Sequence, residues 1–173
     1  MKQRYKEVHD VIKPNLNILF VGINPGIQTA ITGFHFAHPS NRFWKTLYAA
    51  GFTPYVLAPY ENRKLLDFNF GITNVINRPT KSEKELTQNE FEKGRIILLQ
   101  KINSYQPQWV AFIGIGLYRK TFNKNNAQIG MAECIYNSQV WILPQPSGLN
   151  AHYPPEKLVV KFKEFFDVVN SNK

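Results

Sequence analysis

The sequence predicts an α/β domain, a three-layer α/β/α sandwich around a mainly parallel central sheet. Short apolar runs recur along the chain and alternate with segments of helical periodicity, as strands and helices do in parallel α/β folds. Residues 109–113 are apolar at every position, which is typical of a strand buried on both faces of a sheet. The chain has 173 residues with 43% hydrophobic content, enough for one domain with a substantial core.

Each element is expected where the spacing of apolar residues changes. A polar and basic arm over 1–15 precedes the first strand, and 28–39 is expected to be a loop. Ser40 or Asn41 can cap the next helix, because both side chains accept hydrogen bonds from unpaired backbone N–H groups. The expected strands are, in order, 16–22, 71–76, 109–113 and 140–143. The first expected helix begins at about residue 41, and the other four span 61–67, 89–105, 114–122 and 155–169. A turn at 77–80 and a polar, exposed segment at 81–87 follow the second strand.

Three of the helices have an apolar face that the spacing predicts to be buried. These faces are Phe43, Trp44, Leu47 and Tyr48 in the first, Phe91, Leu98, Ile102 and Tyr105 in the third, and Leu158, Phe162, Phe165 and Val169 in the last.

The charge of the chain favours a polyanionic partner. Lys and Arg number 21 against 12 Asp and Glu, a formal net charge of +9. Nucleic acid is favoured over a membrane surface because no continuous basic amphipathic helix stands out. The alternative is a basic surface that is simply solvated, and charge alone does not exclude it. No apolar signal core and no run of membrane-spanning length are visible, so we expect an intracellular, cytoplasmic protein that does not bind membranes.

The metal-binding residue types are few. Cys134 is the only cysteine, which excludes an internal disulfide, a thiolate zinc cage and a cysteine-ligated iron–sulfur cluster. The alternative is a metal site that collects His35 and His38 with the distant His152 and Cys134. No carboxylate lies near them in sequence to serve as a ligand or to orient one. We therefore expect no metal and no cofactor.

A polar side chain follows directly after the first predicted strand. Asn24 lies within Gly22 to Gly26, where Pro25 restricts the backbone of Asn24 and Gly26 permits a tight reversal. Ligands of open α/β sheets bind at the carboxyl ends of the strands, which is where Asn24 is expected. The alternative is that these residues only form a turn. Asn24 cannot act as a strong base, but its amide can orient a water molecule or a substrate group.

The surroundings of Asn24 lack acid–base groups. The chain contains no Asp or Glu between Asp10 and Glu61. An enzyme built on Asn24 would rely on positioning and electrostatics. Such a site suits a reaction whose leaving group departs largely unaided and leaves a cation that water traps.

A second unusual loop, residues 144–150, follows the last predicted strand. Parallel topology would place it at the same edge of the sheet as Asn24. Pro144 and Pro146 stiffen the loop, Gly148 allows close backbone approach, and Leu149 is apolar where a polar residue is expected. An exposed apolar tip on a basic protein could serve as a wedge between base pairs. Equally, Leu149 could fold back onto the core.

Six segments of the chain resemble the mismatch-specific uracil/thymine-DNA glycosylases. The matches run in order along nearly the whole chain, from about 16 to 160, and they are specific. They are GINPG at 22–26, GFHFAHPSNRFW at 33–44, GFT at 51–53, GITN at 71–74, RPT at 78–80 and PSGLN at 146–150. The bacterial mismatch-specific branch is more similar than the longer vertebrate thymine branch, because extended flanking tails are absent.

The resemblance implies a single glycosylase domain over 1–173 with the fold of the uracil-DNA glycosylases. It implies an enzyme of base excision repair that hydrolyses the N-glycosidic bond of uracil, or of a related deaminated or damaged base, opposite guanine. We expect the enzyme to be monofunctional, because no lysine stands in the motif loops to form a Schiff base. The implied partner is double-stranded DNA with a guanine–uracil or related mismatch, bound by a monomer. The target nucleotide would have to leave the helix, because a stacked base is inaccessible to chemistry.

The resemblance also implies roles for individual residues. Asn24 would position the attacking water, Phe36 would stack on the flipped base, and backbone groups near Ile23 and Phe36 would read the pyrimidine edge. The residues implied for the base pocket are Ile23, Gln28, Thr29, Phe36 and Asn74. Those implied for the wedge and for the guanine left unpaired are Ser147, Gly148, Leu149 and Asn150, with His152 near a phosphate.

The chain departs from the family pattern at several of these positions. Gln145 replaces a shorter Asn before the wedge, and Ala151 falls where some members carry Arg. Gln28 and Thr29 stand where small Ser or Ala is common, so the pocket could be narrower and disfavour the methyl group of thymine, or could admit a different base.

Two other function classes remain open. The first is a noncatalytic mismatch- or damage-binding protein that uses the same wedge and never releases a base. The second is a hydrolase of free nucleosides or nucleotides, against which the basic charge and Leu149 argue.

Overall fold

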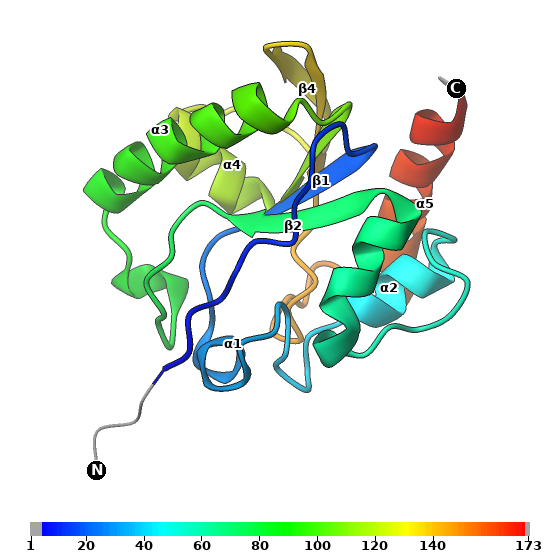
Figure 1. Ribbon diagram of the computed structural model, residues 1–173, viewed down its shortest axis with the longest axis horizontal. Coiled ribbons are helices and arrows are strands. Elements are labelled where there is room, and N and C mark those ends of the chain that lie inside the picture. Colours follow the sequence, from blue (N-terminus) through cyan, green and yellow to red (C-terminus); the bar gives the residue numbers. More distant parts are fainter. Residues whose placement is uncertain (1–4, 172–173) are drawn as a thin grey trace.

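A five-stranded sheet forms the middle layer of the protein, with strand order β2-β1-β3-β5-β4 (Figure 1). The computed structural model describes residues 5–171. Neighbouring strands pair in parallel, except that β4 pairs antiparallel with β5. The strands are β1 (Ile18–Gly22), β2 (Phe70–Asn74), β3 (Trp109–Ile113), β4 (Gly130–Ile135) and β5 (Ser138–Leu143). The mainly parallel sheet confirms this part of the predicted fold class.

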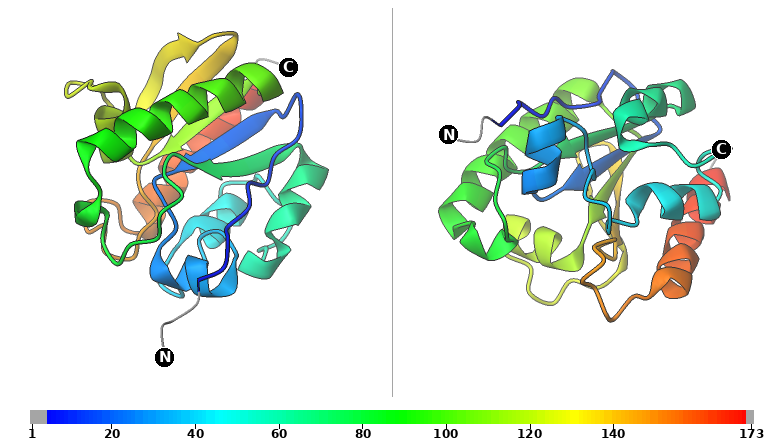
Figure 2. Two further views of the ribbon diagram at one scale, coloured as in Figure 1. Left: turned by 60° about the vertical axis from the view of Figure 1, so that its left-hand side comes forward. Right: turned by 90° about the horizontal axis from the view of Figure 1, so that it is seen from below.

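Helices cover both faces of the sheet (Figures 1 and 2). They are α1 (Ile27–Thr32), α2 (Phe43–Ala49), α3 (Gln88–Tyr105), α4 (Ile115–Phe122) and α5 (Pro155–Ser171), with 3-10 helices η1 (Pro59–Phe68) and η2 (Glu83–Glu85). Alternate residues of a strand point to opposite faces. On β1, Ile18 and Phe20 belong to the core formed with α2, η1 and α5, whereas Leu19 and Val21 belong to the core formed with α3 and α4. The three-layer sandwich is therefore confirmed.

Most predicted elements are present, but two were missed. Residues 28–39, predicted as a loop, contain most of α1. This helix has six residues, and Gly26 precedes it without a side-chain cap, so it carries no helix-start signature. The strand β4 was also missed, because its residues are exposed or half-buried at the edge of the sheet and form no apolar run. The expected helix at 61–67 is present as the longer 3-10 helix η1.

The predicted helix faces are buried with one clear exception. Tyr48 is 47% exposed near the end of α2, so its assignment to the buried face is wrong. Tyr105 is half-buried at the end of α3. The capping expectation is correct for Asn41, since its Oδ1 accepts a hydrogen bond from the Phe43 N–H at 2.9 Å.

The N-terminal arm is tied to the sheet. Val11 is buried and exchanges two backbone hydrogen bonds with Ile72 of β2, at 2.9 and 2.8 Å. Lys101 on α3 forms an ion pair with Asp10 at 2.6 Å, and the Thr73 hydroxyl donates to the same carboxylate at 2.8 Å. The arm thus braces β2. Its first four residues lie outside the described part of the chain. Across 5–171, every helix is too short or too polar to cross a membrane.

The close approach of α3 to the end of β2 gives a test of the packing. A Cβ on Gly94 would lie 2.3 Å from the Val75 carbonyl oxygen, directly after β2, whereas a Cβ on Gly116 of α4 would meet open space. We expect Gly94→Ala to lower the free energy of unfolding by about 1–3 kcal/mol through overpacking.

Urea denaturation of Gly94→Ala and of a control, Gly116→Ala, measures this change in the free energy of unfolding. Gly116→Ala is the matched control, and it should be neutral or up to about 1 kcal/mol more stable, because alanine favours helix. Equal stability of the two variants would contradict the packing of α3 on Val75.

Candidate active site at the carboxyl edge of the sheet

Parallel pairing gathers four strand ends at one edge of the sheet. The chain passes from β1 to its neighbour β2 on one side and then to β3 on the other, so the strand order reverses between β1 and β3. Such a switch point is the preferred ligand site of open α/β sheets. The view from below in Figure 2 shows α1, α2 and the segment after β5 together on this side. The expectation that Asn24 and the loop after β5 share one edge is confirmed.

The side chain of Asn24 is held in one orientation by the turn after β2. Its amide nitrogen donates to the Arg78 carbonyl at 2.8 Å and to the Thr80 hydroxyl at 2.9 Å. A carbonyl oxygen can only accept, so the Nδ2 atom must be the one that faces Arg78. Both amide hydrogens are thereby used, which leaves the Oδ1 atom as an acceptor for a water molecule or a substrate hydroxyl.

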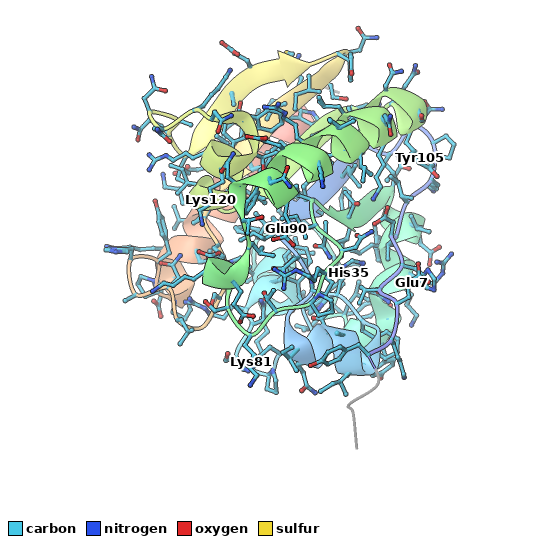
Figure 3. The ribbon with its side chains drawn as sticks, turned by 90° about the vertical axis from the view of Figure 1, so that its left-hand side faces the viewer. Glu7, His35, Lys81, Glu90, Tyr105 and Lys120 are labelled. Carbon is cyan, nitrogen blue, oxygen red and sulfur yellow. The ribbon has the colours of Figure 1, made fainter. Side chains whose placement is uncertain are left out.

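The turn that holds Asn24 is itself anchored. The Arg78 guanidinium donates to the Glu90 carboxylate of α3 at 2.7 Å and to the Glu85 carbonyl at 3.0 Å. The Arg78 side chain, followed by the Thr87 N–H, lowers the pKa of Glu90 to about 2. Glu90 is therefore a committed anion rather than a general base. Figure 3 shows Glu90 below the start of α3 and Lys81 lower still.

An aromatic ring and a second amide lie over the end of β1. A Cβ on Gly22 would lie 2.6 Å from Asn74 Oδ1 and 3.6 Å from the Phe36 ring. The Phe36 backbone is left-handed, with φ 51°, and its ring stacks on Phe43 with a centroid distance of 4.1 Å. Two residues predicted for the base pocket, Phe36 and Asn74, are thus brought together at Gly22, two residues before Asn24. Gly22 is the residue whose missing side chain makes this possible.

The segment that carries Phe36 is fixed from the inside. His35 is 2% exposed, and its Nε2 atom lies 2.9 Å from the His9 carbonyl, so that nitrogen is the protonated one. The indole N–H of Trp44 donates to the His35 carbonyl at 3.2 Å. The Ala37 N–H donates to the Thr29 hydroxyl at 3.3 Å, which ties α1 to the residue after Phe36.

The remaining predicted pocket residues border this cluster. The Ile23 carbonyl accepts from the Ile76 N–H at 2.9 Å, so one lone pair is already used. Gln28 is half-buried on α1. Thr29 is buried and bonds within the protein. Thr29 therefore affects the pocket indirectly, by fixing the position of residues 36 and 37.

The predicted wedge lies at the tip of residues 144–150, which we call the finger loop. Leu149 is 93% exposed, which rules out the alternative that it folds back onto the core. Its N–H donates to the Ser147 hydroxyl at 3.2 Å, and the Asn150 side chain donates to the Gln145 carbonyl at 2.9 Å. The main-chain oxygen of Gln145, rather than its longer amide, makes this contact. The tip is therefore apolar and exposed on a loop that is internally hydrogen-bonded.

The finger loop rests on the segment that follows Phe36. A Cβ on Gly148 would lie 2.8 Å from the Ser40 carbonyl oxygen. The Ser40 hydroxyl and N–H contact His38 Nδ1 at 2.8 and 3.1 Å. His38 and His152 are exposed, and His35 is buried away from them. Within residues 5–171, no three His, Cys, Asp or Glu side chains gather closely enough to hold a metal ion.

Three functional candidates were missed by the sequence reasoning, namely Arg42, Arg78 and Thr80. All three lie in segments that match the family, but each acts through contacts distant in sequence. Arg42 donates to carbonyls of the finger loop, more than 100 residues away. Nothing in the local pattern predicts such a contact.

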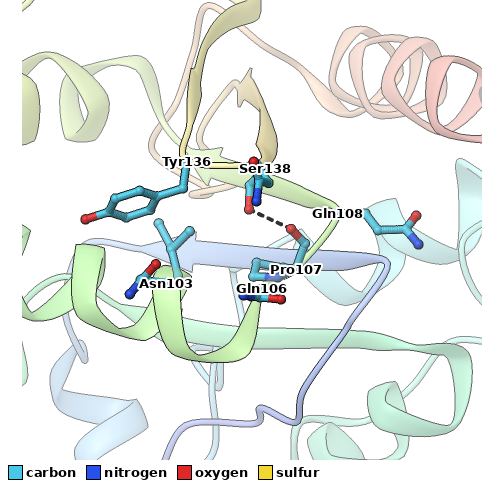
Figure 4. Close-up of a pocket in the computed structure, with 8 residues that line it drawn as sticks. Asn103, Gln106, Pro107, Gln108, Tyr136 and Ser138 are labelled. Carbon is cyan, nitrogen blue, oxygen red and sulfur yellow. Dashed lines mark hydrogen bonds between the residues drawn. The ribbon is translucent and has the colours of Figure 1, made fainter.

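Two surface depressions lie outside this cluster. One, of about 220 Å³, is lined by neutral residues including Gln108 and Ser138 at the amino ends of β3 and β5, on the opposite edge of the sheet (Figure 4). The other, of about 310 Å³, lies between residues 5–8 and the prolines Pro25 and Pro79, on the flank of the turn that holds Asn24. Neither is lined by Asn24, Phe36 or Leu149.

The fold and the site together define a class of protein. It is a three-layer α/β domain with an anchored strand-end carboxamide, an aromatic platform and an exposed apolar finger at one edge of its sheet. A sequence model of the Uracil DNA glycosylase superfamily matches residues 9–171, and the chain belongs to that superfamily.

A solved structure shares the fold. The solution NMR structure of a Methanosarcina acetivorans protein described as a "putative Uracil DNA glycosylase" superposes with a TM-score of 0.60. The sequence identity is 17%, and the match covers 96% of this chain and 98% of that chain. At this identity the likeness shows a common fold.

Burial of His35 makes a prediction about pH. Burial lowers the pKa of His35 below its ordinary value of 6.5, although the His9 carbonyl opposes the shift. Below about pH 6.5 the unfolded chain therefore binds a proton that the folded chain does not. We expect the free energy of unfolding to fall as the pH drops from 6.5 to 5, by up to about 1.4 kcal/mol per pH unit from this residue.

Urea denaturation at several pH values measures the slope of the free energy of unfolding against pH. His35→Gln cannot titrate and keeps an N–H donor, so it should lose His35's share of the slope. His152→Gln, at an exposed histidine, is the matched control and should keep it. Identical slopes for the two variants would show that His35 is not the group responsible.

Proposed function

We propose that this protein is a monofunctional DNA glycosylase that hydrolyses the N-glycosidic bond of uracil, or of a related deaminated or damaged base, opposite guanine. The observation that carries the proposal is the position of Asn24. Its amide is fixed with Oδ1 free to accept, beside an aromatic platform and on the same edge as an exposed Leu149. Membership of the Uracil DNA glycosylase superfamily supports it.

The chemistry follows from the absence of an available base. The carboxylate of Glu90, which holds Arg78, and that of Asp10, which accepts from Thr73 of β2, are both paired with cations. The glycosidic bond would therefore break first, with its electron pair leaving on the base and a cation developing at the sugar C1′. A water molecule that donates one hydrogen bond to Asn24 Oδ1 would then add through its oxygen to C1′. It would lose a proton to solvent, and the departed base would gain one.

The base pocket is proposed to use Phe36 and Asn74. The Phe36 ring, stacked on Phe43, offers a flat surface for the extruded base. The Asn74 carboxamide carries both a donor and an acceptor, which can pair with the edge of a pyrimidine. The tie from Thr29 to Ala37 limits how far this segment can retreat. Such a pocket should favour uracil over the bulkier thymine.

The finger loop would act on the duplex while the base is extruded. Flipping costs a few kcal/mol and is least costly for a mismatched pair. An apolar side chain inserted between bases can fill the space left behind. Leu149 is the exposed apolar residue at the tip, and the neighbouring backbone and Asn150 could pair with the remaining guanine. We propose that a preference for mismatches arises from the lower cost of flipping a mismatched base and from contacts of Asn150 and the loop backbone with the guanine.

The proposal is tested by single-turnover base release. The substrate is a duplex with uracil opposite guanine, treated with alkali to cleave abasic sites, beside duplexes that carry thymine, hypoxanthine, xanthine or ethenocytosine. Asn24→Ala should reduce the rate by about 10²–10³-fold, the usual cost of removing one preorganised polar group. Binding to the duplex should change little, since phosphate contacts dominate affinity.

Asn126→Ala, at an exposed position in a polar loop, is the matched control and should release base at the wild-type rate. No base release by the native protein from any of these duplexes would contradict the proposed function. Salt-sensitive binding without release would instead indicate a noncatalytic mismatch-binding protein.

The role of the finger is tested separately by Leu149→Ala. Because Leu149 is 93% exposed, the free energy of unfolding should change by less than about 0.5 kcal/mol. Base release from a fully paired adenine–uracil duplex should fall more than release from a guanine–uracil mismatch, because the mismatch opens more easily. Fluorescence of 2-aminopurine beside the target reports the flipped fraction. An equal loss on both duplexes would argue against the wedge.

A further inference from the structure

The Arg42 side chain lies beneath the finger loop and donates to it at several points. One terminal nitrogen donates to the Tyr153 carbonyl at 2.8 Å. The other donates to the Ser147 carbonyl, and to the Asn150 carbonyl at 3.3 Å. The Arg42 backbone N–H donates to the Pro146 carbonyl at 2.9 Å. One residue thus contacts four main-chain oxygens on both sides of Leu149.

The Arg42 guanidinium is bound by main-chain dipoles. Among the ion pairs of residues 5–171, none involves Arg42, and its Nε atom is buried without a hydrogen-bond partner. Arg42 is half-buried, and a charge that is partly removed from water needs good hydrogen bonds, which the loop carbonyls supply. The loop carbonyls are therefore held toward Arg42, and the tip residue is left to project outward.

Arg42 also joins the finger loop to the base platform. It stands immediately before α2, and its carbonyl accepts from the Thr46 N–H at 2.9 Å and from the Thr46 hydroxyl at 2.6 Å. The next residue, Phe43, is the one on which Phe36 stacks. Gly148 packs against Ser40 on the same connection. The aromatic platform and the finger loop are therefore joined through residues 40–43.

We propose that Arg42 is a positioning residue that fixes the finger loop relative to the base platform, so that insertion of Leu149 and capture of the base occur in one motion. This inference rests on the proposed function of the same site. The planar fork of arginine is what the role requires, because three carbonyls lie around it in fixed directions. A lysine keeps the charge but not the fork.

Arg42→Lys separates geometry from charge. With the charge kept, the salt dependence of binding to duplex DNA should be unchanged. Single-turnover base release from a guanine–uracil duplex should fall about tenfold, the cost of roughly one charge-assisted hydrogen bond. Arg63→Lys, at an exposed arginine of η1, is the matched control and should behave as wild type.

A double-mutant cycle with Leu149→Ala asks whether Arg42 acts through the finger. If it does, the double variant should be no slower than the slower single variant, because the same interaction is lost only once. Multiplication of the two losses would overturn the inference, since Arg42 would then act independently of Leu149. A wild-type rate for either single variant would overturn it as well.

Hydrogen exchange gives a reading that does not depend on catalysis. The Asn150 N–H donates to the Ser147 carbonyl at 3.0 Å, within the loop that Arg42 holds. Its exchange should be at least about tenfold faster in Arg42→Lys than in wild type, while α3 amides are unchanged. Unchanged exchange at Asn150 would overturn the inference. Should Arg42→Lys fail to fold, Arg42→Gln, which keeps two donors on a shorter stem, takes its place in the same measurements.

The outcomes separate this inference from the proposed function. A wild-type protein that releases no base disproves the glycosylase proposal, and exchange at Asn150 still decides whether Arg42 orders the loop. Suppose that the wild-type protein releases base but the rate losses of Arg42→Lys and Leu149→Ala multiply in the double variant. The glycosylase proposal then stands, and the proposed role of Arg42 is disproved.

Discussion

The site depends on the parallel pairing of β1 with both of its neighbours. Because β1 lies between β2 and β3 and runs in the same direction as each, their carboxyl ends open on one side of the sheet. Asn24 follows the first of these strands, Asn74 ends the second, and the finger loop follows the nearby β5. Reversal of any one strand would send its polar side chain to the opposite end of the molecule. The shared edge on which these contacts form therefore follows from strand direction.

At this edge of the sheet, hydrogen bonds within the protein hold the polar side chains in place. Asn24 gives its amide hydrogens to Arg78 and Thr80, and Arg78 is held in turn by Glu90 at the start of α3. Each bond removes a way for the next group to move. What remains for a substrate is a small set of acceptors in fixed directions, which is how a site without an available base can contribute to a reaction. The low pKa of Glu90 results from the same hydrogen bond with Arg78 that anchors the turn.

The apolar tip of the finger loop is also held in place by contacts within the protein. Leu149 contributes little to the core, because its side chain is almost fully exposed. The loop beneath it is stiffened by Pro144 and Pro146, by its own hydrogen bonds and by the fork of Arg42. A stiff loop loses little further conformational freedom on binding, which in the proposed function would leave more of the contact energy to hold a duplex open.

Much of this arrangement can be predicted from the sequence, because it depends on local patterns. Apolar runs and helical spacing predict the strands and most helices, and strand order in an α/β fold places Asn24 and the finger loop on one edge. The short α1 and the edge strand β4 were missed because neither carries a strong local signal. The sequence left the direction of Leu149 open, since an apolar residue in a loop can face either way. Only the tertiary structure decides that it projects, and only the structure brings Arg42 beneath it and Arg78 and Thr80 to Asn24. These contacts join segments 54 to 111 residues apart, and their geometry depends on how the whole chain packs.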